Sequence, residues 1–539
     1  MKLVTAEQMR ALEQRVVDAG TSLDELMQAA GLAVAQEAWL SLGVVAGRRI
    51  LVLVGPGNNG GDGLVAARHL AEWEGDVVVY MLAARDESDS NLRAVRDLGV
   101  PVYVAGDDEG YRALDEAIGR AEMIIDALLG IGRSRPITGV MAEILGRVND
   151  AHGRSPAPRV VAVDLPTGVD ADSGRADPLA VRADMTVTFG FAKVGLYTLP
   201  GSEYAGKVQV IDIGLPKGAE HEVTVELLAS TWIRDRLPAR PLDANKGTFG
   251  RVLVVAGSDN YVGAARMTAE GCYRSGAGLV TIACDASVQA AVAPALPEAT
   301  YLRRGAGAAD ALIEALSSYD VLLIGPGLGQ SEETRALVLD VLARVPESVR
   351  GCVVDADALN ALARVDGWSE RVKARCVLTP HPGEMARLTG KTPGDVQSDR
   401  LNIAMHAASH WGQVVVLKGA HTIVANPSGA AAVSPYANPL LASAGTGDVL
   451  AGAIAGLLAQ GASLFDAAAC GVYVHAMAGE ELGDELGDRG LLASDLLPVI
   501  PRVIKIIREG RPMRSAASPF GGGLEALAGL GGGAPPGMG

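Results

Sequence analysis

The sequence is poor in several residue types, and each shortage excludes some classes of function or site. Only 4% of the 539 residues are aromatic, and the formal net charge is −16. Such an acidic chain is a poor partner for nucleic acid or for an anionic membrane. The five cysteines are scattered and form no Cys-x-x-Cys pair. We therefore expect neither a zinc site nor a disulfide framework, and the odd count of isolated cysteines is typical of a reducing compartment.

Long apolar segments are also lacking. No apolar run reaches the ~20 residues that a membrane-spanning helix needs. The first residues, 1–14, have no apolar core of the kind found in secretory signals. We therefore expect a cytoplasmic protein without a membrane partner.

Glycine and short apolar runs are abundant instead. The 67 glycines among 539 residues, about 12%, exceed the usual ~7%. Apolar runs of four or five residues, each ending in a glycine loop or an aspartate, predict buried parallel strands. We expect an α/β protein of two doubly wound domains, an N-terminal Rossmann-like one and a C-terminal one. The expected ranges are 1–216, 223–512, and a flexible Gly/Ala/Pro-rich tail at 513–539.

The expected strands are distributed over both halves of the chain. In the first half they are 49–54, 76–81, 102–104, 123–126, 160–164, 185–189, 192–197 and 208–213. In the second half they are 251–256, 279–283, 321–324, 352–355, 377–379, 414–417 and 423–425, the last as a hairpin partner of 414–417.

A glycine-rich loop, 55–63, follows the first of these strands and precedes a helix expected from residue 64 to residue 72. A strand, a glycine loop and a helix in this order are typical of a phosphate-binding turn. Asn58, Asn59 and Asp62 add side-chain oxygens that simple turn packing does not require. The alternative is a tight turn with Asx caps.

Aspartates end two further strands of the first half, as Asp126 and Asp164. Because the carboxyl ends of parallel strands face one crevice, these carboxylates could converge there with Asn59 and Thr167. Hard oxygen ligands without Cys or His suit an alkali or alkaline-earth cation better than zinc. Each aspartate taken singly could equally cap a turn. We interpret Lys193, which follows the strand 185–189, as a surface lysine rather than an anion contact.

The second half contains Gly445-Thr446-Gly447-Asp448, placed between a polar loop and the apolar run 449–459. This order predicts a glycine turn that opens a buried helix, whose first amides can bind an anion. A carboxylate beside an anion repels it, unless the carboxylate takes a proton from the hydroxyl that attacks the anion. The alternative is that Asp448 caps the helix.

Lys418 ends the strand 414–417 and can neutralise phosphate charge, while the residues up to Thr422 offer backbone and hydroxyl contacts to a nucleotide. Phosphoryl transfer needs little beyond these groups, a magnesium ion and in-line positioning. His381 and Glu384 could contact the substrate and magnesium, respectively. The alternative for His381 is a buried, hydrogen-bonded imidazole.

Nine motifs together carry a family resemblance. KGTFGRVLVVAGS, IGPGLG, DADALN, LTPHPGE, LKGAHT and GTGDVLAG lie in order within 245–480. They resemble the ribokinase-like superfamily and, more closely, the ADP/ATP-dependent NAD(P)H-hydrate dehydratases. GPGNNGGDG, DALLGIGRSRP and VDLPTGVDADSG lie within 1–214 and resemble the NAD(P)H-hydrate epimerases. The order of the halves is similar to that of the bacterial bifunctional nicotinamide-nucleotide repair enzymes.

The resemblance implies two reactions. The epimerase half would interconvert the R and S forms of the hydrated cofactors NADHX and NADPHX. The dehydratase half would phosphorylate the hydroxyl of the S form from ADP, after which loss of phosphate restores NAD(P)H and leaves AMP. The implied cofactors are potassium and magnesium, with ADP as co-substrate, and a homo-oligomer is expected because related dehydratases are often tetrameric. The preference between ADP and ATP stays open.

The resemblance also implies site residues. Potassium would bind at Asn59, Asp126 and Thr167, and Glu384 is the candidate magnesium ligand. The hydrate would lie along Asn58, Asn59, Gly60, Gly61, Asp62, Gly130, Ile131, Gly132, Arg133, Ser134, Arg135, Pro136 and Asp164 in the first half, and at Ala264, Gly327, His381 and Asp448 in the second. The nucleotide would contact Lys418, Gly419, Ala420, His421, Thr422, Gly445, Thr446 and Gly447. Asp448 would deprotonate the hydroxyl, and either Asp164 or Asp62 would be the epimerase base.

The sequence departs from the family pattern before the glycine turn, where 438–444 reads NPLLASA instead of a more glycine-rich version. His381 stands where sugar kinases of the superfamily usually carry Asn, which favours the hydrate enzyme. Two rival hypotheses are a small-molecule kinase fused to a binding domain, and an N-terminal half that only senses nucleotides or binds a partner.

Overall fold

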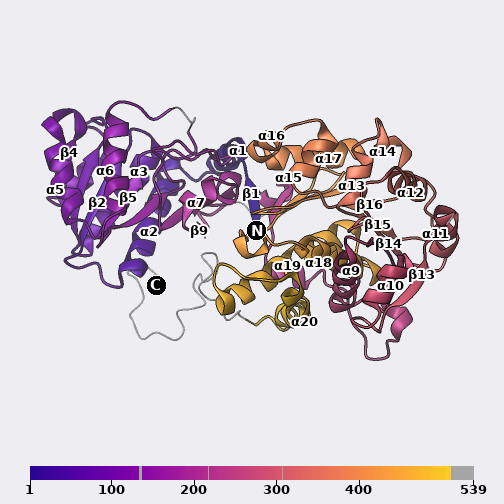
Figure 1. The fold of residues 1–539 in the computed structure, drawn as a ribbon. Helices are drawn as coiled ribbons and strands as arrows, with labels where there is room; N and C mark the ends of the chain where they lie inside the picture. Colours follow the sequence, from indigo (N-terminus) through magenta and orange to yellow (C-terminus); the bar gives the residue numbers. More distant parts are fainter. Residues whose placement is uncertain (133–135, 216–217, 306, 512–539) are drawn as a thin grey trace. The chain divides into compact units, whose positions relative to one another are not determined.

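The computed structural model describes residues 1–132, 136–215, 218–305 and 307–511 (Figure 1). The tail expected at 513–539 lies outside these ranges. The described chain forms two compact units, one at Lys2–Val223 and one that begins at Thr224. Both units are α/β, which confirms the expected fold class. Within the described ranges, no helix combines the length and the apolarity needed to cross a bilayer.

The first unit is built on a seven-stranded parallel sheet with the order β4-β3-β2-β5-β6-β7-β9. The strand order reverses between β2 and β5, which places a crevice at the carboxyl ends of these two strands. The strands are β2 (Arg49–Val54), β3 (Asp76–Met81), β4 (Val102–Val104), β5 (Met123–Ala127), β6 (Arg159–Val163), β7 (Met185–Phe189) and β9 (Lys207–Ile211).

Helices cover both faces of this sheet (Figure 1). Because side chains alternate along a strand, Ile50, Val52 and Val54 pack with one helix layer, α1 to α4, and Leu51 and Leu53 pack with α5 and α6. The helices are α1 (Ala6–Asp18), α2 (Leu23–Leu42), α3 (Asn58–Glu72), α4 (Ser90–Asp97), α5 (Arg112–Arg120), α6 (Val140–His152) and α7 (Gly201–Ala205).

Two details of the first unit correct the sequence-based expectations. Helix α3 begins at Asn58, not at residue 64, so most of the glycine stretch is its first turns. A Cβ at Gly60 would lie 2.0 Å from the Gly55 carbonyl oxygen, and one at Gly63 would lie 2.5 Å from the Ala127 Cβ. These glycines therefore let the helix press against the strand ends, which is a packing role rather than a loop role.

The strand expected at 192–197 is also wrong. Only β8 (Ala192–Lys193) is extended, and it pairs in parallel with β1 (Lys2–Val4) rather than joining the seven-stranded sheet. A 3₁₀ turn, Val194–Tyr197, follows. A Cβ at Gly195 would lie 2.1 Å from the Asp170 carbonyl oxygen, so the backbone is held against a neighbouring loop instead of continuing as a strand.

The second sheet has the order β13-β12-β11-β14-β15-β16-β17-β18-β19-β10. Strands from β13 to β17 are parallel, and β17, β18 and β19 form antiparallel pairs, which confirms the expected hairpin. The strands are β10 (Val225–Leu227), β11 (Arg251–Val255), β12 (Leu279–Cys284), β13 (Thr300–Arg303), β14 (Val321–Ile324), β15 (Gly351–Val354), β16 (Cys376–Leu378), β17 (Val414–Leu417), β18 (Ile423–Ala425) and β19 (Ala431–Val433).

The helices of the second unit surround this sheet (Figure 1). They are α8 (Ser230–Arg234), α9 (Val262–Ser275), α10 (Ala286–Val292), α11 (Ala308–Leu316), α12 (Glu332–Ala343), α13 (Asp357–Leu362), α14 (Trp368–Arg371), α15 (Pro382–Thr389), α16 (Pro393–Ser398), α17 (Arg400–Trp411), α18 (Thr446–Ala459), α19 (Leu464–Leu486) and α20 (Ala493–Glu509).

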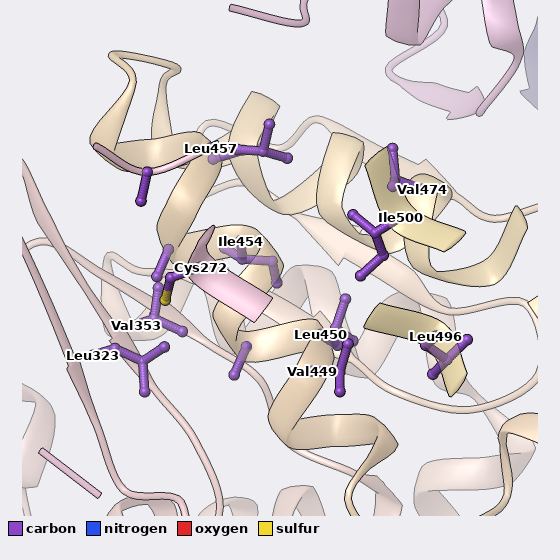
Figure 2. Packing of buried hydrophobic residues seen from close by; sticks show 14 of the residues in the cluster. Cys272, Leu323, Val353, Val449, Leu450, Ile454, Leu457, Val474, Leu496 and Ile500 are labelled. Atoms are coloured by element: carbon purple, nitrogen blue, oxygen red, sulfur yellow. The ribbon is translucent and has the colours of Figure 1, made fainter. Parts of the chain in front are cut away.

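Helix α18 lies deep in the core of the second unit, where its apolar side chains meet those of the sheet and of α9, α19 and α20 (Figure 2). Full burial of a side chain such as Ile454 contributes roughly 1.5–3 kcal/mol. A Cβ at Gly452 would lie 2.3 Å from the Thr268 carbonyl oxygen, and one at Gly456 would lie 2.1 Å from Ser275 Oγ. The close contact with α9 fixes α18, and therefore also the turn that precedes it.

Candidate functional site

The predicted glycine turn opens helix α18. Gly445 caps the helix with φ +89°, and a Cβ there would lie 2.6 Å from the Met267 methyl group. Among the described residues, none accepts a hydrogen bond from the backbone amides of Gly447 and Asp448. These amides are therefore available to an anion, as the first amides of a helix commonly are.

Asp448 is the third residue of α18, and no described residue donates a hydrogen bond to its carboxylate. The cap position belongs to Gly445, so the structure does not support the helix-cap alternative. Burial, and then the nearby Asp355 carboxylate, raise the pKa of Asp448 to about 7, although Lys418 opposes this shift. A carboxylate with a pKa near neutrality is suited to accept a proton from a hydroxyl.

Lys418 lies directly beneath the glycine turn. Its Nζ is 2.7 Å from Asp355 Oδ1 and 3.9 Å from Glu384 Oε2, and it lies 3.4 Å from where a Cβ of Gly447 would be. Burial alone would lower the pKa of this ammonium group, but the two carboxylates outweigh burial and raise it. The lysine is therefore held in its charged form beside the free amides.

Asp355 was not among the site residues expected from the sequence. Its side chain follows β15 and is 1% exposed, and it accepts a hydrogen bond from Thr379 Oγ1 at 2.7 Å as well as the bond from Lys418. A signal was present, because Asp355 ends an apolar strand as Asp126 and Asp164 do. Thr379 itself gave no comparable signal.

His381 and Glu384 form the N-terminal cap of α15. His381 Nδ1 accepts hydrogen bonds from the amides of Gly383 and Glu384, at 3.0 and 3.3 Å. Burial and then Lys418 lower the pKa of His381, which agrees with a neutral ring protonated on Nε2. The side chain is 51% exposed, so the buried-imidazole alternative is wrong.

Glu384 is itself buried. Its Oε2 accepts the His381 amide at 2.8 Å, and burial raises the pKa of its carboxyl group to about 7 against the opposing effect of Lys418. Asp355, Glu384 and Asp448 thus surround a single lysine. Among the described residues, no three carboxylate, histidine or cysteine side chains are arranged to hold a metal ion, so a divalent cation here would also need ligands from bound phosphates.

The chain turns sharply after Lys418. Gly419 is exposed with φ +136°, and Thr422 Oγ1 donates to its carbonyl oxygen at 2.8 Å. His421 points inward: its Nδ1 donates to the Ser434 carbonyl oxygen at 3.1 Å, and burial lowers its pKa to about 4. The imidazole of His421 therefore holds the loop in place, and Gly419, Ala420 and Thr422 form its accessible part.

Ala264 and Gly327 lie together, although they are far apart in the sequence. Gly327 has φ +64°, and a Cβ there would lie 2.8 Å from the Ala264 Cβ. Ala264 is in α9, the same helix whose Met267 reaches Gly445. One end of α9 thus connects these two predicted hydrate contacts with the glycine turn.

In the first unit, Asn59 and Gly130 meet at the crevice between β2 and β5. A Cβ at Gly130 would lie 3.0 Å from Asn59 Oδ1. Asn59 Nδ2 is buried and has no hydrogen-bond partner among the described residues. Such an orphaned amide nitrogen is unusual and points to a partner supplied by a bound ligand.

Asp126, near the end of β5, and Thr167, in the loop after β6, are hydrogen-bonded to each other. The Thr167 amide donates to Asp126 Oδ2 at 2.8 Å, and Thr167 Oγ1 donates to Oδ1 at 2.7 Å. Complete burial raises the pKa of Asp126 to about 6. The Leu129 amide donates to Thr167 Oγ1 at 3.0 Å, which connects this pair to the Gly130 turn.

Lys193 is not a surface residue, and that expectation is wrong. Its side chain is 1% exposed, and Nζ donates to Asp164 Oδ1, to Thr188 Oγ1 at 3.0 Å and to the Phe189 carbonyl oxygen at 3.2 Å. Asp164 has φ +67°, an unusual conformation for a residue with a side chain. The ion pair therefore fixes a strained aspartate at the end of β6.

Two further carboxyl groups face this ion pair. Burial, then the charges of Asp164 and Glu13, raise the pKa of Asp62 well above its usual range. Burial also raises the pKa of Glu13, which α1 contributes. Sequence reasoning missed Glu13, although it lies in the apolar stripe formed by Met9, Leu12 and Val16. A carboxylate on an otherwise apolar helix face was the feature of the sequence that could have identified Glu13.

The remaining residues predicted to contact the hydrate differ in their exposure. Asn58 is exposed at the start of α3, whereas Gly60 and Gly61 are buried in its first turn. Arg10 of α1 donates to the Ile131 carbonyl oxygen, which ties that loop to α1. Gly132 and Pro136 are exposed. Arg133, Ser134 and Arg135 lie outside the described residues.

Comparison with known proteins agrees with the division of the chain into two units. A family model described as NAD(P)H-hydrate dehydratase matches residues 252–502, and one described as YjeF-related protein N-terminus matches residues 23–195. Proteins named bifunctional NAD(P)H-hydrate repair enzyme Nnr match almost the whole chain. The one from Moorella thermoacetica is 40% identical over 94% of this chain and 98% of its own length, and the one from Escherichia coli K12 is 36% identical over 93% of each.

Solved structures are also similar to about half of the chain, and one of them comes from Bacillus subtilis. The ADP/ATP-dependent NAD(P)H-hydrate dehydratase from Bacillus subtilis, co-crystallised with ATP and Mg²⁺, is 35% identical to this chain. It covers 52% of this chain and 99% of its own, with a TM-score of 0.47.

Proposed function

Because the chain belongs to the family of bifunctional NAD(P)H-hydrate repair enzymes, we propose that it restores NAD(P)H from its hydrates by one reaction in each unit. Residues 1–216 epimerise R and S NADHX and NADPHX. Residues 223–512 dehydrate the S form at the expense of ADP, with AMP and phosphate as products. The observation that carries the dehydratase proposal is the Asp448 carboxylate beside Lys418 and two backbone amides, for none of which the described part of the second unit supplies a hydrogen-bond partner other than those of Lys418.

In the dehydratase reaction, Asp448 accepts the proton of the substrate hydroxyl, and the oxygen attacks the terminal phosphoryl group of ADP. The amides of Gly447 and Asp448 donate to the transferring phosphoryl oxygens, and the Lys418 ammonium offsets their charge. AMP leaves with the electrons of the broken P–O bond. The phosphate ester then breaks at its C–O bond while the adjacent ring carbon loses a proton, which restores the double bond of the dihydronicotinamide.

Magnesium fits the charge balance of this site. Asp355, Glu384 and Asp448 face one lysine, and burial already raises the pKa values of Glu384 and Asp448 to about 7. Glu384 and Asp355 are the residues that would hold the ion. When bound with the nucleotide, magnesium would supply positive charge to the phosphates. We propose ADP as the donor.

In the epimerase reaction, Asp62 and Asp164 take opposite roles. R and S hydrates differ at the ring carbon that carries the hydroxyl, so exchange requires that this hydroxyl leave and return on the other face. Burial and the charges of Asp164 and Glu13 raise the pKa of Asp62 and favour its protonated form. We assign Asp62 as the acid that donates a proton to the leaving hydroxyl, which departs as water. Asp164, ion-paired with Lys193, accepts a proton from the water that adds to the opposite face.

Potassium fits the oxygen atoms around Asn59. The Asn59 side-chain oxygen, the Asp126 carboxylate and Thr167 Oγ1 would hold the ion, which would supply positive charge beside the glycine-rich start of α3. The cation is expected to orient the bound hydrate rather than to take part in proton transfer.

Asp126 provides the test of this cation site. Asp126→Asn, which keeps the size of the side chain, is expected to lower R/S exchange about 10- to 100-fold and to abolish its dependence on potassium. Dehydration of the S form should stay within about 2-fold, because Asp126 belongs only to the first unit's site. Exchange is measured by chromatography in K⁺ and in Na⁺ buffers. An equal loss of both reactions would show that the two halves are not independent.

The proposed overall function has a direct optical test. Incubation of chemically hydrated NADH with the protein and ADP should restore absorbance at the wavelength characteristic of NADH, with one AMP formed per NADH. The purified R form should react as well, because epimerisation supplies the S form. A stable phosphorylated product without restored absorbance would instead support the small-molecule kinase alternative. Failure of the R form alone would support the sensing or partner-binding alternative for the first half.

We also propose a cytoplasmic homo-oligomer. Support for a reducing compartment comes from the sequence, whose five cysteines are scattered and form no Cys-x-x-Cys pair. Light scattering on the full chain tests the oligomeric state.

A further inference from the structure

Arg400, the first residue of α17, is an unusual buried cation. The residue is 5% exposed. Its Nη2 donates to the carbonyl oxygens of Leu417 and Lys418 at 3.1 and 3.2 Å, and its Nη1 donates to Gln397 Oε1 at 2.7 Å. Within the described ranges, no carboxylate lies within ion-pair distance of this guanidinium group.

A buried charge without a counter-charge is costly. Buried arginines are normally paired with carboxylates, and neutral carbonyl and amide oxygens offset the charge only in part. Burial lowers the pKa of Arg400 to about 10, which still leaves the group protonated at neutral pH. The start of a helix adds further positive potential. The local environment therefore favours the approach of an anion.

The direction from which an anion can approach is set by Gly419. A Cβ at Gly419 would lie 3.1 Å from both Nη atoms of Arg400, so this glycine is packed directly on the guanidinium group. Gly419 is itself exposed, with φ +136°. Gly419 therefore lies between the guanidinium group of Arg400 and the outer side of the Lys418–Thr422 turn, and it adds no side chain to that separation.

We propose that Arg400 is a positioning residue for the adenine nucleotide. It fixes the two carbonyl groups that precede Gly419, so that Lys418 and the following turn keep one geometry, and its charge attracts the nucleotide phosphates across Gly419. This inference rests on the proposed nucleotide-dependent reaction of the second unit. The phosphate groups of the bound nucleotide then supply the counter-charge that Arg400 lacks among the described residues.

Arg400→Gln tests the inference in the full chain. We expect the Kd for ADP, measured by calorimetry without hydrate, to rise at least about 10-fold. The KM for ADP should rise in parallel, while the KM for the S hydrate and the R/S exchange rate stay within about 2-fold. Arg400→Lys keeps the charge but cannot bond both carbonyl groups in the same way, so an intermediate loss of ADP affinity is expected.

Arg375→Gln is the matched control. Arg375 precedes β16 at the opposite end of the sheet, where its Nη2 donates to the Arg350 carbonyl oxygen at 3.0 Å and its side chain is exposed. This variant should bind ADP with unchanged affinity. If R375Q weakens ADP binding as much as R400Q does, the loss is a general effect of removing an arginine and the inference is overturned.

Two other outcomes overturn it. In one, R400Q raises the KM values of ADP and hydrate equally, which indicates a purely structural role. In the other, R400Q binds ADP with wild-type affinity. If R400Q does not fold, as judged by loss of a cooperative melt of the second unit, R400K decides, and unchanged ADP affinity in R400K overturns the inference. Because ADP binding is measured without turnover, a wild-type protein that binds ADP but restores no NADH refutes the proposed reaction and leaves the role of Arg400 testable.

Discussion

Asp448→Asn is expected to lower the dehydratase rate by about 10²- to 10⁴-fold, the range that a positioned general base typically contributes. The amide side chain cannot accept the proton of the substrate hydroxyl, whereas the free amides of the turn and Lys418 remain in place. ADP binding should therefore persist. The rate is measured as restoration of NADH from the purified S hydrate, and retained ADP binding together with a cooperative melt reports on correct folding of the second unit.

The pH dependence of the wild-type reaction follows from the same carboxylate. Because the pKa of Asp448 is raised to about 7, kcat/KM for dehydration should fall as the pH decreases below about 7, where the base becomes protonated.

The free energy of unfolding should depend on pH in the opposite direction from kcat/KM, so that it falls as the pH rises. The folded protein holds the Asp448 proton more tightly than the unfolded chain, whose usual value is 3.8. Ionisation therefore lowers stability as the pH rises from about 4 to 7, and the loss is constant above 7. The amide introduced by D448N cannot ionise, so this variant should be more stable than the wild type at pH 8, on the order of 1–2 kcal/mol after solvent screening, and equally stable at pH 4.

Asp495→Asn is the matched control for this variant, because Asp495 occupies the same third position in α20. Its Oδ2 accepts the Leu492 amide at 2.9 Å, so it is a true helix cap. D495N should lose a little stability and no dehydratase activity. Normal turnover by D448N would remove Asp448 from the mechanism.

Asp62→Asn is expected to lower R/S exchange by about 10²- to 10⁴-fold with little loss of stability. Burial and the neighbouring carboxylates raise the pKa of Asp62 and so favour its neutral form in the folded protein. An amide of the same size therefore removes the proton donor without removing a charge. Exchange between R and S hydrates is followed by chromatography, and dehydration of the S hydrate should be unchanged. Wild-type exchange by D62N would exclude Asp62 as the acid.

Asp164→Asn should behave differently, which separates the two carboxyl groups. It leaves the buried Lys193 ammonium without its counter-charge, and breaking a buried pair in this way costs about 3–5 kcal/mol. Both exchange and stability of the first unit should fall. The double variant D164N/K193M removes the uncompensated charge, so it should recover stability but not exchange. Recovery of exchange in the double variant would show that Asp164 is not the base.

The pattern of strands and turns was largely predictable. Each strand is a short apolar run, and side-chain alternation with flanking glycine or aspartate is local information. Several bounds agree with the structure, among them those of β3, β7, β14 and β17. The start of α3 was misplaced because glycine is read locally as a turn, whereas Gly60 and Gly63 serve contacts with Gly55 and Ala127.

Motif spacing likewise predicted the glycine turn at Gly445 and the free carboxylate that follows it. The sequence could not reveal what pairs with Lys418, because Asp355 and Glu384 reach it from two other strands or their connections. For the same reason the burial of Lys193 was missed: its environment is made by Thr188, Phe189 and Asp164 once β6, β7 and β8 have come together.

The sequence by itself therefore determined the fold class, the order of the two units, the family and the residue types available for each reaction. Only the tertiary structure decided which of these residues are charged, paired or free. Among the described residues, no donor reaches the Asp448 carboxylate and no carboxylate pairs with Arg400 beneath Gly419, whereas the His421 ring turns inward and supports its loop. These properties depend on burial and on neighbours distant in the chain, and desolvation and charge proximity are physical quantities that no local pattern encodes.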